Sequence, residues 1–219
     1  PVKIVSDQNL VAAERVIYTV NSVPTSFSEM MALPNSQLDT TYWLPYYNNV
    51  DLNTQLRFGN VSGASATVRM YIGGVEQSSC TSTPSKTYPY VLAASESVRV
   101  SCVGLSNGPV KIVSDQNLVA AERVIYKVNG VNTSFSEMMA LPNSRLSTTY
   151  LLPFYNNVDL DTQLRFGNVS GASATVRVYI GGVEQTSCTS TPSKAYPYVL
   201  ASGESVRVSC VGLSNGPVK

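Results

Sequence analysis

The stretch ATVRMYIGG, residues 66–74, sets the fold class of this chain. Apolar side chains at the even-numbered positions alternate with Thr67, Arg69 and Tyr71, and a period of two is typical of a strand with one buried face. Gly73-Gly74 then predicts a tight turn into a second strand over Val75–Ser78. This pair of segments predicts an antiparallel β-hairpin.

The same alternation recurs outward from this hairpin, with Gly, Pro and Asn-rich turns about every 8–12 residues, as in a β-sandwich. One short segment, Ser28–Leu33, has a helical pattern, and Pro34 would end it. Tyr88–Leu92 contains Pro89 and is expected at a sheet edge, because proline cannot donate to a central ladder. Besides Ala66–Ile72 and its partner, strands are predicted over Val11–Tyr18, Thr40–Leu44, Leu56–Phe58, Tyr88–Leu92 and Ser97–Val103, with Val98, Val100 and Cys102 facing the core.

The chain of 219 residues is a tandem repeat: residues 109–216 copy residues 1–108 with 13 differences, and 217–219 begin a third copy. Each copy has the usual size of a domain. The sequence therefore predicts an all-β protein made of two tandem, near-identical, antiparallel immunoglobulin-like β-sandwich domains, 1–108 and 109–219.

The phase of the repeat would allow an exchange of strands between chains. Val98–Leu105, the turn at 106–108 and the segment 109–114 together have the pattern of a hairpin, so 109–114 is expected to close the first domain. The closing strand of the second domain would then be cut short at 217–219. The N-terminal strand Val2, Lys3, Ile4 and Val5 would have no domain before it, and we expect it to act as an inter-subunit strand.

The phase of the repeat is also compatible with two alternatives to strand exchange. The chain could be a segment of a longer array, and its first residue, a proline, is consistent with a mature form or a fragment. Alternatively, Val2–Val5 could pair within its own domain.

Composition excludes several classes. Charged residues make up 13% of the chain and hydrophobic residues 43%, which argues against disorder. No apolar run approaches the roughly 18 residues of a membrane span, so membrane insertion is not expected. A net charge of +1 gives no electrostatic case for nucleic acid. The absence of histidine removes His-based triads and zinc sites, and we expect no enzyme and no cofactor.

Each copy contains two cysteines separated by 22 residues, Cys80 and Cys102 in the first and Cys188 and Cys210 in the second. An even number per domain favours one disulfide in each, with buried free thiols as the alternative. Two cysteines per copy are too few for a zinc site.

No pattern predicts catalysis. The carboxylates are scattered, and no pair is placed to converge as glycoside hydrolysis requires. The segment Asn48–Asn53 has oxygen donors at alternating positions but lacks the acidic density of a calcium site, so an ordinary turn is expected and no metal is assigned.

Two features suggest contact with sugars. Tyr42, Trp43, Tyr46 and Tyr47 form the densest aromatic cluster, either a stacking platform for glycans or a packing cluster. Asn60, Asn132 and Asn168 each begin the three-residue acceptor pattern for N-glycosylation, which also occurs often by chance.

The order of the segments Glu14–Tyr18, Ser26–Met31, Thr40–Asn49, Ile72–Gly74 and Asn107–Val110 resembles tandem immunoglobulin-like repeats of large secreted or cell-surface proteins of bacteria and archaea. The resemblance implies an extracellular or cell-surface location, an array or filament role, and no catalysis. Paired cysteines and near-identical copies depart from looser repeats of this kind and suit a covalently reinforced fibre.

We therefore expect a structural protein, a repeat of an extracellular filament, pilus-like fibre or adhesin stalk, whose partner is itself. The copies would join by head-to-tail packing or strand exchange. The alternative is a tandem carbohydrate- or surface-binding module in which Tyr42, Tyr46, Tyr47 and Tyr88 contact surface glycans.

Overall fold

The computed structural model describes residues 1–219 and consists of antiparallel strands, with helical structure limited to two three-residue 3-10 turns. The all-β prediction is confirmed. Neither 3-10 turn, η1 (Asn35–Gln37) nor η2 (Asn143–Arg145), has the length of a membrane-spanning helix.

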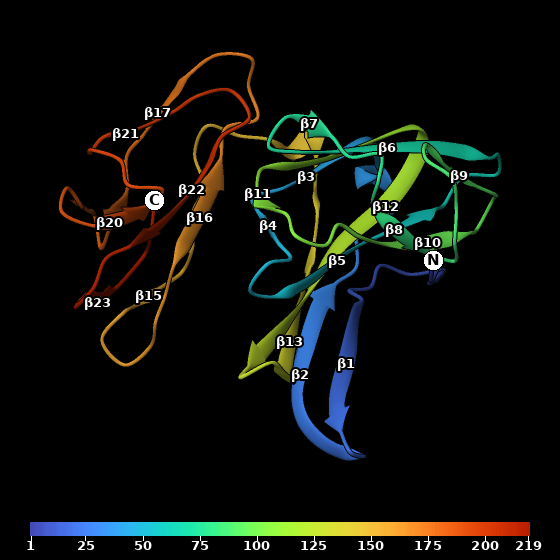
Figure 1. Ribbon diagram of the computed structural model, residues 1–219, viewed down its shortest axis with the longest axis horizontal. Helices are drawn as coiled ribbons and strands as arrows, with labels where there is room; N and C mark the ends of the chain where they lie inside the picture. Colours follow the sequence, from blue (N-terminus) through green and yellow to red (C-terminus); the bar gives the residue numbers. More distant parts are fainter.

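The strands form an N-terminal hairpin, a large first body and a second body of small sheets (Figure 1). The hairpin is β1 (Ala13–Val20) and β2 (Val23–Met31). The first body contains β3 (Asp39–Leu44), β4 (Tyr47–Asn48), β5 (Asn53–Asn60), β6 (Ala66–Ile72), β7 (Val75–Glu76), β8 (Thr81–Thr83), β9 (Tyr90–Leu92), β10 (Ser97–Ser101), β11 (Ser106–Asn107), β12 (Val110–Val128), β13 (Val131–Met139) and β14 (Leu141–Pro142). The second body contains β15 (Tyr155–Asn156), β16 (Leu164–Gly167), β17 (Ala174–Val176), β18 (Tyr179–Ile180), β19 (Val183–Glu184), β20 (Thr189–Thr191), β21 (Tyr198–Leu200), β22 (Ser205–Ser209) and β23 (Ser214–Asn215).

The longest strand, β12, belongs to the second sequence copy but lies in the first body (Figure 1). Its first part, from Val110, lies between β3 and β6 and pairs with both. After a register shift between Val113 and Leu118, its second part pairs with β5 on one side and β13 on the other. Because β12 crosses from one group of strands to the other, it joins the two sides of the body.

A single hydrophobic core of 19 buried residues fills the first body and runs from Tyr42 to Ala140, across the boundary between the sequence copies. The even-numbered residues of Ala66–Ile72 are all buried in it, as their alternation predicts. Val98, Val100 and Cys102 are buried there too, which confirms the predicted inward face.

The second body has nearly the same residues in equivalent positions, with Val178 in place of Met70, but a smaller core of 10 buried residues. Its strands are shorter: β16 has four residues where β5 has eight. The two copies therefore form unequal bodies within these 219 residues. The physical reason is that only Pro217–Lys219, with Val218 bridging Leu152 and Ile180, pair with the second body at the position where β12 pairs with the first.

Most predicted strands appear within two or three residues of their expected bounds, but two local predictions are wrong. Ser28–Leu33 is not helical, since Val23–Met31 is the strand β2. Its backbone bonds go to β1, with Glu29 opposite Arg15, and this pairing outweighs the weak helical propensity of six residues. The expected hairpin of 98–105 with 109–114 is absent, because Val110–Ser114 pairs with β3 and β6 and not with β10.

Candidate assembly site

The segment that enters the first body is the candidate functional site, and we call residues 110–140 the second arm. Val110, Ile112 and Leu118 are completely buried, and Ala120 nearly so. Burying side chains of this size contributes about 1.5–3 kcal/mol each, far more than a surface ion pair. The second arm is therefore a structural part of the first body.

The register of the arm is fixed by its neighbours on both sides. Ile112 lies opposite Tyr42 in β3 and Met70 in β6. The hydroxyl of Tyr42 donates to the carbonyl of Leu118 over 2.7 Å, which holds the arm where it leaves β3 for β5. A slip of one residue would turn the buried side chains outward, so this register is strongly specified.

We call the equivalent residues 2–32 the first arm. In this structure the start of the first arm does not lie between two strands, as Val110–Ser114 lies between β3 and β6. Residues 1–12 form no strand, and Val2, Val5 and Leu10 are exposed. Ile4 is 59% exposed, whereas Ile112, its counterpart 108 residues later, is completely buried. The same sequence is thus an exposed apolar segment in one copy and a core strand in the other.

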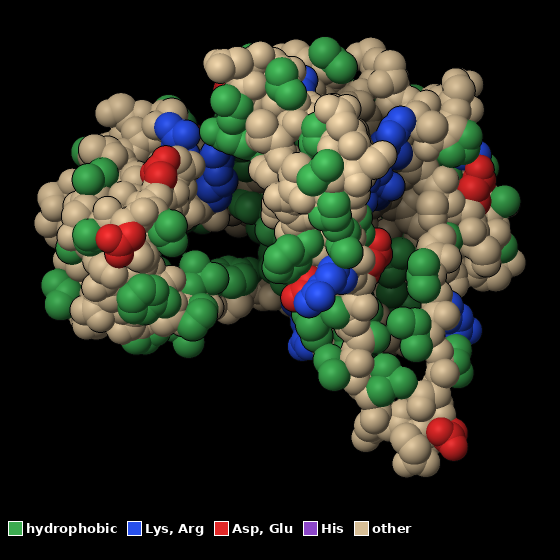
Figure 2. Space-filling model, turned by 90° about the horizontal axis from the view of Figure 1, so that it is seen from below, with side chains coloured by type: hydrophobic (Ala, Val, Ile, Leu, Met, Phe, Trp, Pro, Cys, Tyr) green, Lys and Arg blue, Asp and Glu red, His purple; other side chains and the backbone are tan.

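The second body exposes the side chains that the arm covers in the first. Leu44 is buried, but its counterpart Leu152 is 50% exposed, and Tyr150, the counterpart of Tyr42, is 53% exposed. Figure 2, which looks at the molecule from the end where the hairpins project, shows hydrophobic side chains on the hairpins and on the C-terminal body, interspersed with Lys/Arg and Asp/Glu side chains. We call the uncovered surface around Tyr150, Leu152 and β16 the acceptor face.

An ionisable carboxyl group lies inside the contact between the two copies. Glu122, in β12, is only 5% exposed, and it lies opposite Leu56 of β5. Burial raises the pKa of its carboxyl to about 8, and the nearby Arg165 partly offsets this effect. Burial also lowers the pKa of the Arg165 guanidinium, which lies 4.6 Å from the ring centre of Tyr46.

Sequence analysis missed this cluster of Glu122, Arg165 and Tyr46. A signal was present, since Leu118, Ala120, Glu122 and Val124 occupy one face of the alternating pattern, and a carboxylate among apolar residues on that face indicates an unusual environment.

Direct hydrogen bonds also join the copies. The hydroxyl of Ser205 donates to the carbonyl of Pro45 over 2.6 Å, and the indole N–H of Trp43 donates to Oδ1 of Asn143 over 2.9 Å. The backbone N–H of Ser144 donates to Asp39 Oδ2 over 2.9 Å. The second copy is therefore attached to the first by polar contacts as well as by the inserted arm.

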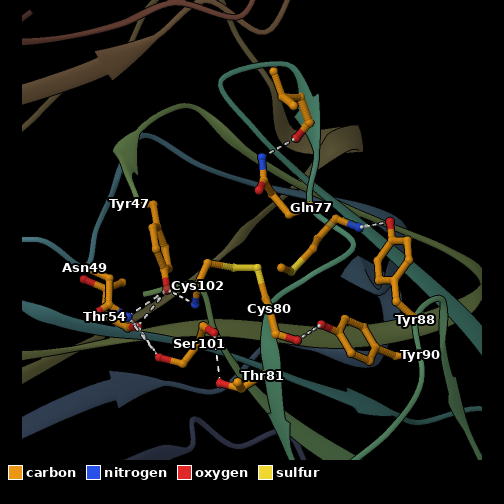
Figure 3. Close-up of a disulfide and its surroundings, with 12 residues drawn as sticks. Tyr47, Asn49, Thr54, Gln77, Cys80, Thr81, Tyr88, Tyr90, Ser101 and Cys102 are labelled. Atoms are coloured by element: carbon orange, nitrogen blue, oxygen red, sulfur yellow. Dashed lines mark hydrogen bonds between the residues drawn. A yellow bond between two sulfur atoms is a disulfide. The ribbon is translucent and has the colours of Figure 1, made fainter. Parts of the chain in front are cut away.

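Each body contains one disulfide, Cys80–Cys102 in the first and Cys188–Cys210 in the second. Beside the first (Figure 3), the hydroxyl of Tyr47 accepts from the backbone N–H of Cys102 over 2.7 Å and donates to the carbonyl of Thr54 over 3.0 Å. The hydroxyl of Tyr90 donates to the carbonyl of Cys80 over 3.2 Å. Such disulfides are typical of proteins that fold in oxidising compartments.

Of the two alternatives for the aromatic cluster, a glycan platform or a packing cluster, the positions of its rings fit packing. Tyr42 and Tyr47 are completely buried, with their hydroxyls bonded to backbone carbonyls. Trp43 and Tyr46 are half-buried, and Lys111 and Arg165 lie over their rings. Tyr88 donates to Glu76 over 2.7 Å, and burial together with this bond raises its pKa to about 12.

Two of the three acceptor asparagines for glycosylation are structural. The amide nitrogen of Asn60 is buried and donates to the carbonyls of Ala64, Leu92 and Ala93, and Asn168 makes the equivalent bonds in the second body. A buried nitrogen bonded in this way is closed to a glycan in the folded protein. Asn132, at the tip of the β12–β13 hairpin, is exposed.

The segment Asn48–Asn53 is a turn in which Asn48 Oδ1 accepts from the backbone N–H groups of Val50 and Asp51. The side-chain oxygen of Asn48 is therefore used within the turn. No group of three or more acidic, cysteine or histidine side chains gathers in the structure.

Comparisons with known proteins identify no relative. No family model, curated protein or solved structure matches this chain.

Proposed function

We propose that this chain is a structural protein whose copies join head to tail into an extracellular filament, pilus-like fibre or adhesin stalk. In this proposal the first arm of one copy enters the acceptor face of another, as β12 enters the first body. Each completed body would then be an immunoglobulin-like sandwich stapled by its disulfide.

The observation that carries the proposal is that one sequence, present twice in the chain, has two different structures. Residues 110–120 lie in a strand that buries Val110, Ile112 and Leu118. Residues 2–12, which have the same sequence, form no strand, and Val2, Ile4 and Leu10 are exposed. An exposed apolar segment and an uncovered apolar face are a hazard for a protein in water unless they find partners. The arm and the face are complementary in sequence. Ile4 is the counterpart of Ile112, and the second body contains the counterparts of Tyr42 and Met70, the residues opposite Ile112.

The contact is heterologous, since the arm and the face lie on different parts of the chain. A contact of this kind gives open chains of subunits when its rotation does not close into a ring. Strand addition supplies both backbone hydrogen bonds and core side chains, which makes it a strong joint. The near-identity of the copies supports this role, because equivalent joints require equivalent surfaces.

Electron microscopy and sedimentation of the 219-residue protein test the proposal. We expect rods that lengthen with protein concentration and have an axial repeat of one or two bodies. Ile4→Asp should abolish them, because a carboxylate cannot enter the apolar groove. Val50→Asp, at an exposed valine outside both arms, is the matched control and should assemble normally. Monodisperse two-body particles at every concentration would contradict the proposal.

A further inference from the structure

A second contact between the copies lies outside the groove. The β1–β2 hairpin and the β12–β13 hairpin lie side by side (Figure 1), although no backbone ladder joins β2 to β13. The rings of Tyr18 and Phe135 pack with their centres 5.2 Å apart at an angle of 53°. The backbone N–H of Glu137 donates to the hydroxyl of Ser28 over 2.9 Å.

Each residue in this contact has a counterpart, 108 residues away in the sequence, that is more exposed to solvent. Phe135 is 7% exposed beneath Tyr18, whereas Phe27 is 63% exposed. Conversely, Ser28 is buried against β13, whereas Ser136 is exposed, and Tyr126, the counterpart of Tyr18, is 53% exposed. The chain therefore has a second, unpaired copy of each side of this contact: the surface around Phe27 on one hairpin, and Tyr126 and Ser136 on the other.

The two hairpins have the same local structure, so the open surface is already in its binding form. Arg15 lies 5.3 Å from the ring centre of Phe27, and Arg123 lies at the same distance from Phe135. Each arginine also pairs with the glutamate of its hairpin, Glu29 or Glu137. Beside Phe27, a shallow hollow is lined by Arg15, Ile17, Pro24, Thr25 and Ser26.

We propose that the face of the β1–β2 hairpin around Phe27 is a docking surface for Tyr126 and Ser136 of a second copy of this chain. The occupant follows from continuity with the contact inside the chain, in which Tyr18 and Ser28 occupy the equivalent face around Phe135. Tyr126 would pack on Phe27, and the backbone N–H of Glu29 would donate to the hydroxyl of Ser136.

This inference rests on the proposed function, because the docking would accompany insertion of the first arm into the acceptor face. It adds a separate surface: the arm supplies a core strand, and the hairpins fix how successive bodies are turned relative to one another. The 13 differences between the copies leave both members of the contact unchanged, since Tyr18, Phe27, Ser28 and Glu29 are all repeated. The differences Thr19→Lys127, Ser22→Gly130 and Pro24→Asn132 lie nearer the hairpin tips.

Photo-cross-linking tests the geometry. A benzoylphenylalanine placed at position 126 in 15N-labelled protein is mixed with unlabelled protein, so that mass spectrometry separates contacts between chains from contacts within one. We expect cross-links from position 126 to residues 15–29 of the other isotope. Cross-links between chains that fall on any other region would overturn the docking surface.

Sedimentation of point variants tests its contribution. Phe27→Asp should weaken association about tenfold or more, because an aromatic pair is replaced by a charge facing a ring. Val91→Asp, at a similarly exposed residue on the edge strand β9, should leave association unchanged. Circular dichroism melts of both variants check that each remains folded.

The two proposals fail differently. If Phe27→Asp assembles as the unmodified protein does, the hairpin surface is wrong and assembly through the arm stands. If the unmodified protein does not assemble, the proposed function fails and the docking surface fails with it.

Discussion

Ile112 lies directly opposite Met70, and both side chains are completely buried although they come from different copies of the repeat. The first body is therefore complete only because the second copy supplies a strand to it. Ile4, the counterpart of Ile112 in the first copy, is exposed to solvent. This contrast gives the molecule matched internal controls, since each residue of the second arm can be compared with its counterpart in the first.

Replacing Ile112 by alanine should destabilise the first body by about 2–5 kcal/mol, because the change leaves a cavity in a packed core. Ile4→Ala should alter the stability of the monomeric protein by less than about 0.5 kcal/mol. Urea unfolding at concentrations where the protein is monomeric measures both. Equal effects of the two substitutions would mean that the arm does not contribute to the core of the first body.

Tyr47→Phe should cost about 1–3 kcal/mol, because it leaves the buried N–H of Cys102 without its acceptor. The control is Tyr46→Phe, whose hydroxyl contacts Ser106 at the surface and whose counterpart is already Phe154. That change should be within about 0.5 kcal/mol of neutral. Thermal unfolding followed by near-ultraviolet circular dichroism compares them, and a neutral Tyr47→Phe would refute the role given to its hydroxyl.

Glu122 predicts an unusual pH dependence. Because burial raises the pKa of its carboxyl from 4.5 to about 8, the folded state holds a proton that the unfolded state has lost. The free energy of unfolding should thus be highest below about pH 4.5 with respect to this group, fall as pH rises, and level off above about pH 8. The slope from one such group is at most about 1.4 kcal/mol per pH unit.

Carboxyls with lowered pKa values, such as Glu76 and Glu96, affect stability in the opposite direction and only at acid pH. Urea titrations between pH 5 and 8 therefore isolate the effect of Glu122. Glu122→Gln should remove the slope, and Glu14→Gln, at the exposed counterpart, should leave it. A slope that survives Glu122→Gln would contradict this assignment.

Glycosylation should distinguish the three asparagines. In a host that glycosylates exported proteins, we expect a glycan on Asn132 of the folded protein and none on Asn60 or Asn168, whose side chains are buried and bonded. Glycopeptide mass spectrometry of the folded, secreted protein measures this directly. A fully occupied, correctly folded Asn60 would show that its bonds to the carbonyls of Leu92 and Ala93 are not formed.

Each disulfide closes a loop between residues 22 apart. In the chain-entropy model, a disulfide that closes a loop of this length stabilises the folded state by about 3 kcal/mol. Cys80→Ser with Cys102→Ser should lower the stability of the first body by this amount. Reduction of the unmodified protein should lower the stability of both bodies. If reductant leaves the urea unfolding curve unchanged, the disulfides do not stabilise the protein.

Much of the fold was predictable from local pattern. The alternation in Ala66–Ile72 predicts a strand and its buried face, and both are observed. The even number of cysteines in each copy favours the two disulfides that form. Local pattern failed at Ser28–Leu33, a segment of helical character whose first four residues, Ser28–Met31, lie in β2 because β1 offers backbone partners. It left the aromatic cluster open between a glycan platform and a packing cluster, since the sequence does not tell which tyrosine rings face the core, and Tyr42 and Tyr47 are buried.

The sequence by itself determined the strands, their inward faces, the disulfide spacing and the existence of two copies, because each depends on neighbouring residues and on periodicity. The tertiary structure alone decided which groove a strand enters and what surrounds Glu122, and it placed Tyr18 against Phe135. The physical reason is that residues 2–12 and 110–120 are identical in sequence, yet Val2, Ile4 and Leu10 are exposed whereas Val110, Ile112 and Leu118 are completely buried. Their local preferences are nearly the same, and only contact with a groove formed by distant residues separates the two states.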